Sequence, residues 1–179
     1  FGASVVALEP QPRVFRALRL LHGRTERVTL IAAAAGREAG EMELHINTRN
    51  PTVSTLAPSF IAAASQAEGW KEQVWDGRVA VPVTTLDHLI AEHGMPDFIK
   101  LDIEGHEAEA LAGLSQPVPL LSFEFTTIQR AEAHACIDRI CGLGHYAFNL
   151  SLGEENALKH TDWISADALR TELNALPQS

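Results

Sequence analysis

The chain has 179 residues, of which 46% are hydrophobic, and a formal net charge of −9 at pH 7. This length fits one domain with a packed core, and the negative charge argues against a nucleic-acid partner, which requires a basic surface. The apolar runs are too short to span a bilayer and the two cysteines indicate no disulfide framework, which favours a cytoplasmic protein without a membrane partner. Assembly into a homo-oligomer is left open.

The first half of the chain alternates between strand and helix signals. Short apolar, β-branched runs indicate strands, and apolar residues three or four positions apart indicate helices. In chain order we predict a strand at residues 4–8, a helix at 13–22, a strand at 28–35, a turn at 36–40, a half-exposed strand at 41–47, a loop at 48–58, a helix at 59–72 and a strand at 79–85. Because Pro82 cannot donate a ladder hydrogen bond, the last strand is predicted to be an edge or irregular strand.

The second half continues the alternation. We predict a short helix capped by Thr85 or Asp87 that ends at His93. After it we predict a strand at 97–103, a helix at 106–114, a strand at 118–125, a helix at 129–141, a strand at 146–152, a last strand near Trp163 and a helix at 166–176. Such alternation predicts an α/β sandwich with a largely parallel sheet.

Two clusters invite a functional interpretation that we do not adopt. One is basic and comprises Arg13, Arg16, Arg19, Arg24 and Arg27. We predict that these arginines form the solvated back of a helix whose buried side carries Phe15, Leu18 and Leu21. The other contains Cys136 and Cys141 near two histidines, but on one helix these cysteines would point roughly 160° apart, so no metal site is predicted.

Acidic residues end three of the predicted strands: Glu9, then Asp102 with Glu104, and Glu124. In FIKLDIEGHE, residues 98–107, strand alternation places Lys100, Asp102 and Glu104 on one face, where Lys100 could keep a carboxylate ionised. Ligands of parallel α/β sheets bind at the carboxyl ends of strands, so we predict a site at this edge. Glu9 could accept hydrogen bonds from a ribose diol, or could instead simply stabilise the following helix.

Four segments, in this order, resemble the FkbM-type methyltransferases: VVALEPQP, VTLIAAAAGREAGEMEL, VPVTTLDHLI and PDFIKLDIEGHEAEALAG. The resemblance covers roughly residues 4–152, and its most specific piece is the Lys-x-Asp-x-Glu-Gly-x-Glu run at residues 100–107. It implies a single methyltransferase domain over residues 1–179 with the class I, Rossmann-like fold: a mostly parallel sheet with an antiparallel C-terminal strand. It also implies S-adenosylmethionine as methyl donor and O-methylation of a sugar or secondary-metabolite hydroxyl, so that the partner is a small-molecule or glycan acceptor.

The resemblance also implies roles for individual residues. Glu9 and Pro10 would lie at the adenosine ribose, and Ala34 and Ala35 beside the adenine. Asp102 would lie near the methionine end of the cofactor and the acceptor. The residues predicted to serve catalysis are Asp102, Glu104 and Lys100, with Asp102 or Glu104 as the base that takes the acceptor's proton. The residues predicted at the acceptor are Ser54, Thr55 and Glu124.

The sequence departs from the family pattern at its start. The family's first strand and glycine-rich loop precede the VVALEP segment, and neither is present here. That strand would lie between the VVAL and IKLDI strands, so we predict an N-terminally incomplete domain with two unpaired strand edges. Two alternative functions are a nicotinamide-dependent oxidoreductase that uses Glu9 for ribose, and an inactive, truncated interaction domain.

Overall fold

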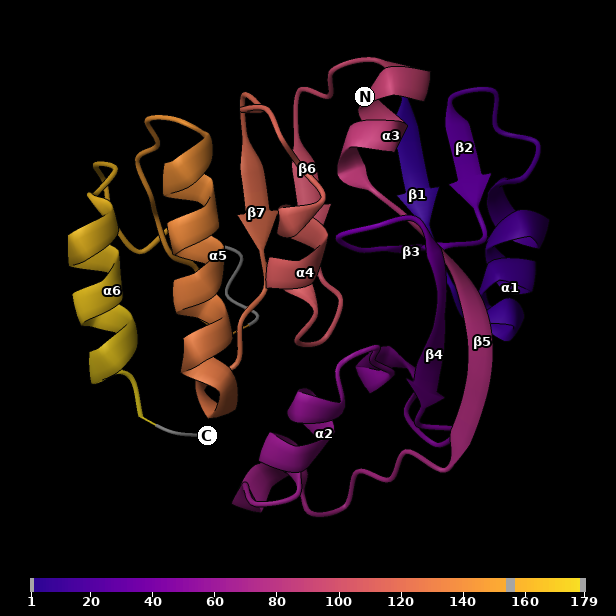
Figure 1. Ribbon diagram of the computed structural model, residues 1–179, viewed down its shortest axis with the longest axis horizontal. Coiled ribbons are helices and arrows are strands. Elements are labelled where there is room, and N and C mark those ends of the chain that lie inside the picture. Colours follow the sequence, from indigo (N-terminus) through magenta and orange to yellow (C-terminus); the bar gives the residue numbers. More distant parts are fainter. Residues whose placement is uncertain (1, 154–156, 178–179) are drawn as a thin grey trace.

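A computed structural model describes residues 2–153 and 157–177 (Figure 1). Its first half contains β1 (Val5–Leu8), α1 (Pro12–His22), β2 (Val28–Ile31), β3 (Ala34–Ala35), β4 (Gly40–Ile46), η1 (Pro51–Val53), α2 (Pro58–Ala64), η2 (Glu68–Trp70) and β5 (Gly77–Thr84). Its second half contains α3 (Leu86–His93), β6 (Ile99–Leu101), α4 (Glu107–Ala112), β7 (Leu121–Phe123), η3 (Thr127–Gln129), α5 (Arg130–Leu143) and α6 (Ala166–Ala175).

Two pairs of parallel strands form the body of this mixed α/β fold. Strand β1 pairs with β2, and β6 pairs with β7. The arrowheads of β1, β2 and β7 point to the lower side of Figure 1, where α2 lies, and β6 runs parallel to β7. The carboxyl ends of both pairs therefore face the same side of the molecule. Within the described residues, β1 and β6 are not paired with each other, so the continuous sheet implied by the resemblance is interrupted there.

A third sheet, with strand order β3-β5-β4, extends from this body. The prediction of one strand over 28–35 is wrong, because the chain leaves β2 at Ile31 and then pairs Ala34 and Ala35 with β5. Of the two alternatives predicted for the strand that contains Pro82, an edge or an irregular strand, the first is wrong, because β5 lies between its two neighbours. The proline is tolerated there because β3 pairs only with the residues that follow it, Val83 and Thr84.

The helix after β5 begins as predicted. The Thr85 side chain accepts a hydrogen bond from the His88 amide at 3.1 Å, which makes Thr85 rather than Asp87 the N-cap of α3. The predicted helix over 59–72 is shorter than expected, since α2 ends at Ala64 and only the single turn η2 follows.

Helix α1 holds its arginines in solvent as predicted, but its other face is not buried. Leu20 and Leu21 are 88% and 73% exposed, so the expectation that Leu21 is a buried residue is wrong. Phe15 and Leu18 are only partly buried, and the helix contains no fully buried residue. The β1-α1-β2 unit is therefore thinly covered on one side.

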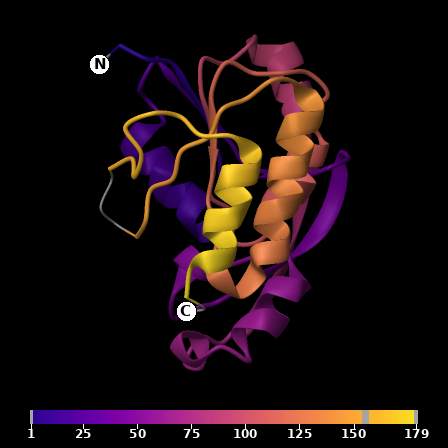
Figure 2. The ribbon, with the colours of Figure 1, turned by 90° about the vertical axis from the view of Figure 1, so that its left-hand side faces the viewer.

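The main core lies on the other side of the molecule, where α4, α5 and α6 pack against β6 and β7. Its fully buried residues include Leu111, Leu114, Ile137, Ile140 and Leu173. Figure 2 shows α5 and α6 side by side over this region. The predicted strand over 146–152 and the last strand near Trp163 reduce to one antiparallel bridge between Phe148 and Ile164. Among the described residues, no helix has both the length and the apolar character needed to cross a membrane.

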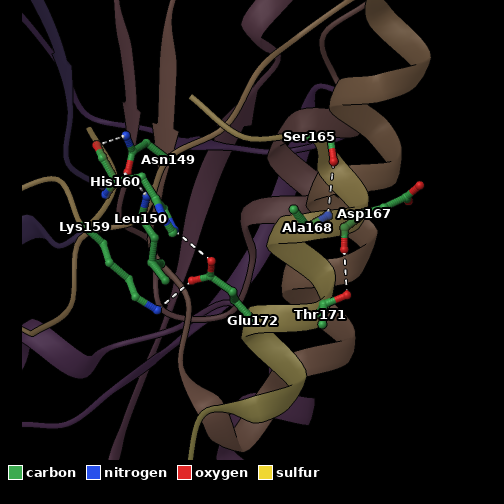
Figure 3. Close-up of polar contacts among 9 residues, drawn as sticks. All are labelled: Asn149, Leu150, Lys159, His160, Ser165, Asp167, Ala168, Thr171 and Glu172. Atoms are coloured by element: carbon green, nitrogen blue, oxygen red, sulfur yellow. Dashed lines mark hydrogen bonds and ion pairs between the residues drawn. The ribbon is translucent and has the colours of Figure 1, made fainter. Parts of the chain in front are cut away.

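Polar contacts attach α6 to the segment that precedes it (Figure 3). Glu172 accepts from Lys159 Nζ at 2.6 Å and lies 2.8 Å from His160 Nε2. Asn149 Nδ2 donates to the His160 carbonyl at 2.8 Å, and Ser165 caps the helix by accepting from the Ala168 amide at 3.2 Å. The last helix is therefore held by directed bonds as well as by its buried leucines.

The interrupted sheet gives a prediction for hydrogen exchange. Val5 and Val6 in β1 are 47% and 39% exposed, and β1 has a neighbour on one side only among the described residues. We expect β1 amides to exchange roughly 100-fold faster than the hydrogen-bonded amides of β5, where Val81 and Val83 are buried at 1% and 6% exposure. Native-state exchange followed by NMR measures this, and equal protection of β1 and β5 would contradict it.

Candidate functional site

The turn after β6 has an unusual backbone. Glu104 has φ +55° and is the only non-glycine residue with a positive φ among the described residues, and Gly105 follows with φ +85°. Two successive left-handed residues reverse the chain sharply between β6 and α4. A Cβ atom at Gly105 would overlap Gln129 Oε1 and lie 3.0 Å from Phe60, so the position requires glycine for space as well as for conformation.

This turn and the end of β7 bring three carboxylates together. Oxygens of Asp102, Glu104 and Glu124 all lie within 4.8 Å of one another. Lys100, on the same strand face, forms an ion pair with Asp102. Carboxylate oxygens at this spacing can face a positively charged group or a small cation. We call Asp102, Glu104 and Glu124 the carboxylate trio.

The members of the trio differ in their protonation. Burial, together with the hydrogen bond and charge of Asp102, raises the pKa of Glu124 to about 8. Burial and the charges of Asp102 and Glu107 raise the pKa of Glu104 to about 7. Burial alone would raise the pKa of Asp102, but hydrogen bonds from Lys100 and Glu124 hold it below its ordinary value. These shifts favour an ionised Asp102 and a protonated Glu124 at neutral pH, and they bring the pKa of Glu104 near that range.

Glu9 lies at the carboxyl end of β1 and is partly buried. Its Oε1 accepts a hydrogen bond from the Gln11 amide at 2.7 Å, and burial raises its pKa against the lowering effect of that bond. The Gln11 side chain binds the loop that follows β4, accepting from Ser54 Oγ at 3.2 Å and donating to the Pro51 carbonyl at 3.1 Å. The predicted residues Glu9 and Ser54 are thus connected through Gln11.

The same loop reaches the trio through Thr55, whose Oγ1 donates to the Glu104 carbonyl at 2.6 Å. The loop is anchored to β4, because Thr55 and His45 exchange two backbone hydrogen bonds of 2.9 and 3.0 Å. The structure therefore connects the Ser54–Thr55 pair to Glu9 on one side and to Glu104 on the other. Contact of either hydroxyl with an acceptor remains a prediction.

The remaining predicted residues lie away from the trio's contacts. Ala34 and Ala35 are 6% and 7% exposed in β3, where Ala34 packs in the core of the third sheet and Ala35 in the main core. Pro10 is partly buried beside Glu9. Their proximity to adenine and ribose remains a prediction. Of the residues considered for zinc, Cys136 is buried and Cys141 exposed on α5.

Glu107 is a site residue whose role the sequence did not reveal. In the sequence Glu107 is only the last acid of the Lys-x-Asp-x-Glu-Gly-x-Glu run, but in the structure it is 2% exposed and its Oε1 accepts from the Ile103 amide at 2.9 Å. A signal was available, since a carboxylate placed four residues after a strand end can bond back across the turn. Beside it lies a cavity of about 10 Å³, room for one water molecule, whose lining includes Glu104, Glu107, Glu124 and Glu132.

A larger cavity of about 370 Å³ lies between α4 and the start of β4, and no residue predicted for the site lines it. Its lining includes Met42, Val83 and His106, with Arg37 and Glu109 joined by two hydrogen bonds of 2.8 and 3.0 Å. His106 is 5% exposed, none of the described residues hydrogen-bonds to its Nε2, and burial lowers its pKa. The sequence suggested only that His106 starts a helix, and it is the N-cap residue of α4.

The parallel strands, which carry acidic side chains to a shared carboxyl edge, place this protein among the α/β proteins, in which ligands commonly bind at that edge. The family model described as the methyltransferase FkbM domain matches residues 1–162. The chain therefore belongs to the FkbM methyltransferase family, as the resemblance predicted. No curated protein and no solved structure is significantly similar to this chain.

Proposed function

We propose that this protein uses S-adenosylmethionine to methylate a hydroxyl group of a sugar or secondary metabolite. The observation that supports this most directly is the carboxylate trio at the carboxyl edge of β6 and β7. Membership of a methyltransferase family supplies the reaction class. The cofactor and the acceptor are the parts that go beyond family membership.

The residues at this edge fit the cofactor chemically. S-adenosylmethionine, when bound, supplies an electrophilic methyl group on a positively charged sulfur. Asp102 carries the most persistent negative charge of the trio and would face that sulfur. Glu9, at the end of β1, offers carboxylate oxygens to the two hydroxyls of a ribose. Both acids follow parallel strands that end on the same side of the molecule.

We assign the proton-accepting role to Glu104. A general base works best with a pKa close to the working pH, and the pKa of Glu104 is raised to about 7. With S-adenosylmethionine bound, the acceptor oxygen would form its bond to the methyl carbon as the carbon–sulfur bond breaks, and the bonding electrons would remain on sulfur. Glu104 takes the hydroxyl proton, while Lys100 keeps Asp102 ionised. Most of the rate gain would come from holding the acceptor oxygen in line with the carbon–sulfur bond, about 3–3.5 Å from the methyl carbon.

Replacing Glu9 by alanine tests the cofactor assignment. Loss of the charge-assisted hydrogen bonds to ribose should weaken S-adenosylmethionine binding by about 1–3 kcal/mol, or roughly 5- to 150-fold. Calorimetric titration of the wild type and the variant measures this. Glu26→Ala, which removes an exposed acid from the same β1-α1-β2 unit, is the matched control and should bind like the wild type. Equal affinity in Glu9→Ala removes Glu9 from the site, and a wild type that does not bind contradicts the proposed function.

A further inference from the structure

The two halves of the proposed site belong to different sheets. Glu9 follows β1, and the trio follows β6 and β7, but among the described residues no ladder joins β1 to β6. Backbone pairing within the described residues therefore does not fix the distance between the Glu9 carboxylate and the trio. Side-chain contacts between the two halves would contribute to the alignment within about 0.5 Å on which transfer depends.

Ser54 and Thr55 supply such contacts from one loop. Ser54 Oγ donates to Gln11, the residue whose amide binds Glu9, and Thr55 Oγ1 donates to the carbonyl of Glu104. Two adjacent residues of one loop thus contact both halves of the proposed site, Ser54 the Glu9 half and Thr55 the trio. Both are buried, at 8% and 1% exposure, and the loop is fixed to β4 through the paired backbones of Thr55 and His45.

Both hydroxyl groups are already used within the protein. Thr55 Oγ1 also accepts from the Ala57 amide at 2.8 Å, and Ser54 Oγ also accepts from the Asn47 amide at 3.3 Å. A hydroxyl has one proton to donate, and in each residue that proton is given to a protein acceptor. This bonding pattern fits a positioning role better than direct binding of the methyl acceptor.

The contact with Glu104 also acts on a strained position. A non-glycine residue in the left-handed region persists only when its surroundings hold it there. Glu107 holds the turn from within by accepting from the Ile103 amide, and Thr55 holds it from the loop through the Glu104 carbonyl. The direction in which the Glu104 side chain leaves the backbone depends on this conformation, so the Thr55 hydroxyl bears on the shape of the trio.

We propose that Ser54 and Thr55 are positioning residues, a brace that sets the Glu9 half of the site against the carboxylate trio. Thr55 fixes the turn that presents Glu104, and Ser54 fixes Gln11 and through it Glu9. The catalytic consequence rests on the proposed function, whereas the effect of the brace on the conformation of the two halves does not.

The test uses Thr55→Val, which removes the hydroxyl at nearly constant shape, with Thr55→Ser as the variant that retains it. Thr52→Val is the matched control, because Thr52 is an exposed residue of the same loop whose hydroxyl bonds only locally to Asn50 at 2.7 Å. In Thr55→Val we expect the backbone chemical shifts of Glu104 and Gly105 to move away from left-handed values. We also expect S-adenosylmethionine to bind about 3- to 10-fold more weakly. Thr55→Ser and Thr52→Val should match the wild type.

A separate variant tests the other arm of the brace and serves if Thr55→Val does not fold. Ser54→Ala should shift the resonances of Glu9 and Gln11, leave those of Glu104 in place and weaken cofactor binding to a similar degree. Unchanged Glu104 resonances in Thr55→Val, or unchanged Glu9 and Gln11 resonances in Ser54→Ala, would overturn the proposal. If these resonances move but the wild type binds no S-adenosylmethionine, the brace stands and the proposed function fails.

Discussion

Replacement of Asp102 by asparagine is expected to lower the rate of methyl transfer at least about 100-fold while leaving the protein folded. The substitution removes the charge that, in the proposed function, would face the cofactor's sulfur, and that helps to raise the pKa of Glu104 to about 7. A misplaced or poorly tuned proton acceptor alone costs about 10²- to 10⁴-fold. Asp102 is an exposed residue whose side chain keeps its shape as asparagine, so unfolding by urea should change by less than ~1 kcal/mol.

The loss of transfer rate is measured in a single-turnover assay with an identified acceptor. Transfer of a labelled methyl group is followed with purified enzyme in excess over S-adenosylmethionine. Asp97→Asn is the matched control, because Asp97 is an exposed aspartate just ahead of the same strand and outside the trio. It should transfer at the wild-type rate. An Asp102→Asn enzyme with normal turnover would refute the role assigned to Asp102.

Replacement of Gly105 by alanine is expected to have the largest effect on stability, lowering the free energy of unfolding by about 2–4 kcal/mol. The residue has φ +85°, and a new Cβ would overlap Gln129 Oε1 and lie 3.0 Å from Phe60. Gln129 can rotate away, but Phe60 is fully buried and packs edge-on against Trp70 at a ring separation of 5.1 Å. The left-handed backbone and the crowding against Phe60 each contribute about 1–2 kcal/mol.

Urea denaturation of Gly105→Ala and Gly94→Ala separates these two contributions. Gly94 has φ +89° and ψ 169°, and a Cβ added at this position would have no atom of the described residues within 4 Å, so its replacement adds only a conformational cost, about 1–3 kcal/mol in this region. A larger loss in Gly105→Ala than in Gly94→Ala would indicate crowding at the turn. Equal losses would show that the space around Gly105 is not restricted.

Much of this architecture could be predicted because local patterns set it. The apolar runs at β1, β6 and β7 and the helical spacing in α1 and α5 predict those elements within a few residues. The rule that ligands bind at strand carboxyl ends led to Asp102, Glu104 and Glu124, which the structure brings within 4.8 Å of one another. The position of each acid at the end of its strand was enough to predict this cluster, because neighbouring parallel strands end at the same edge of the sheet.

Other features depend on partners that are distant in sequence. The third sheet takes Ala34 and Ala35 away from the β2 pairing, although the run VTLIAAAA is continuous in character. Strand β5 is central despite Pro82, because its neighbour β3 is only two residues long. Leu21 has the spacing of a buried residue but is 73% exposed, because no helix or strand of the described residues covers it. In each case the outcome depends on which other element packs or pairs against the segment. The spacing of apolar residues within the segment carries no information about that neighbour.

The sequence by itself determined the family, the alternation of strands and helices and the acidic edge, because these follow from residue types at short spacing. Only the tertiary structure decided how the acids are used. In the tertiary structure Thr55 donates a hydrogen bond to the Glu104 carbonyl, and the buried Glu107 accepts one from the Ile103 amide. Packing also gives Asp102, Glu104 and Glu124 different pKa values. Hydrogen-bond partners and desolvation are properties of the packed interior, where residues 49 positions apart in the chain meet.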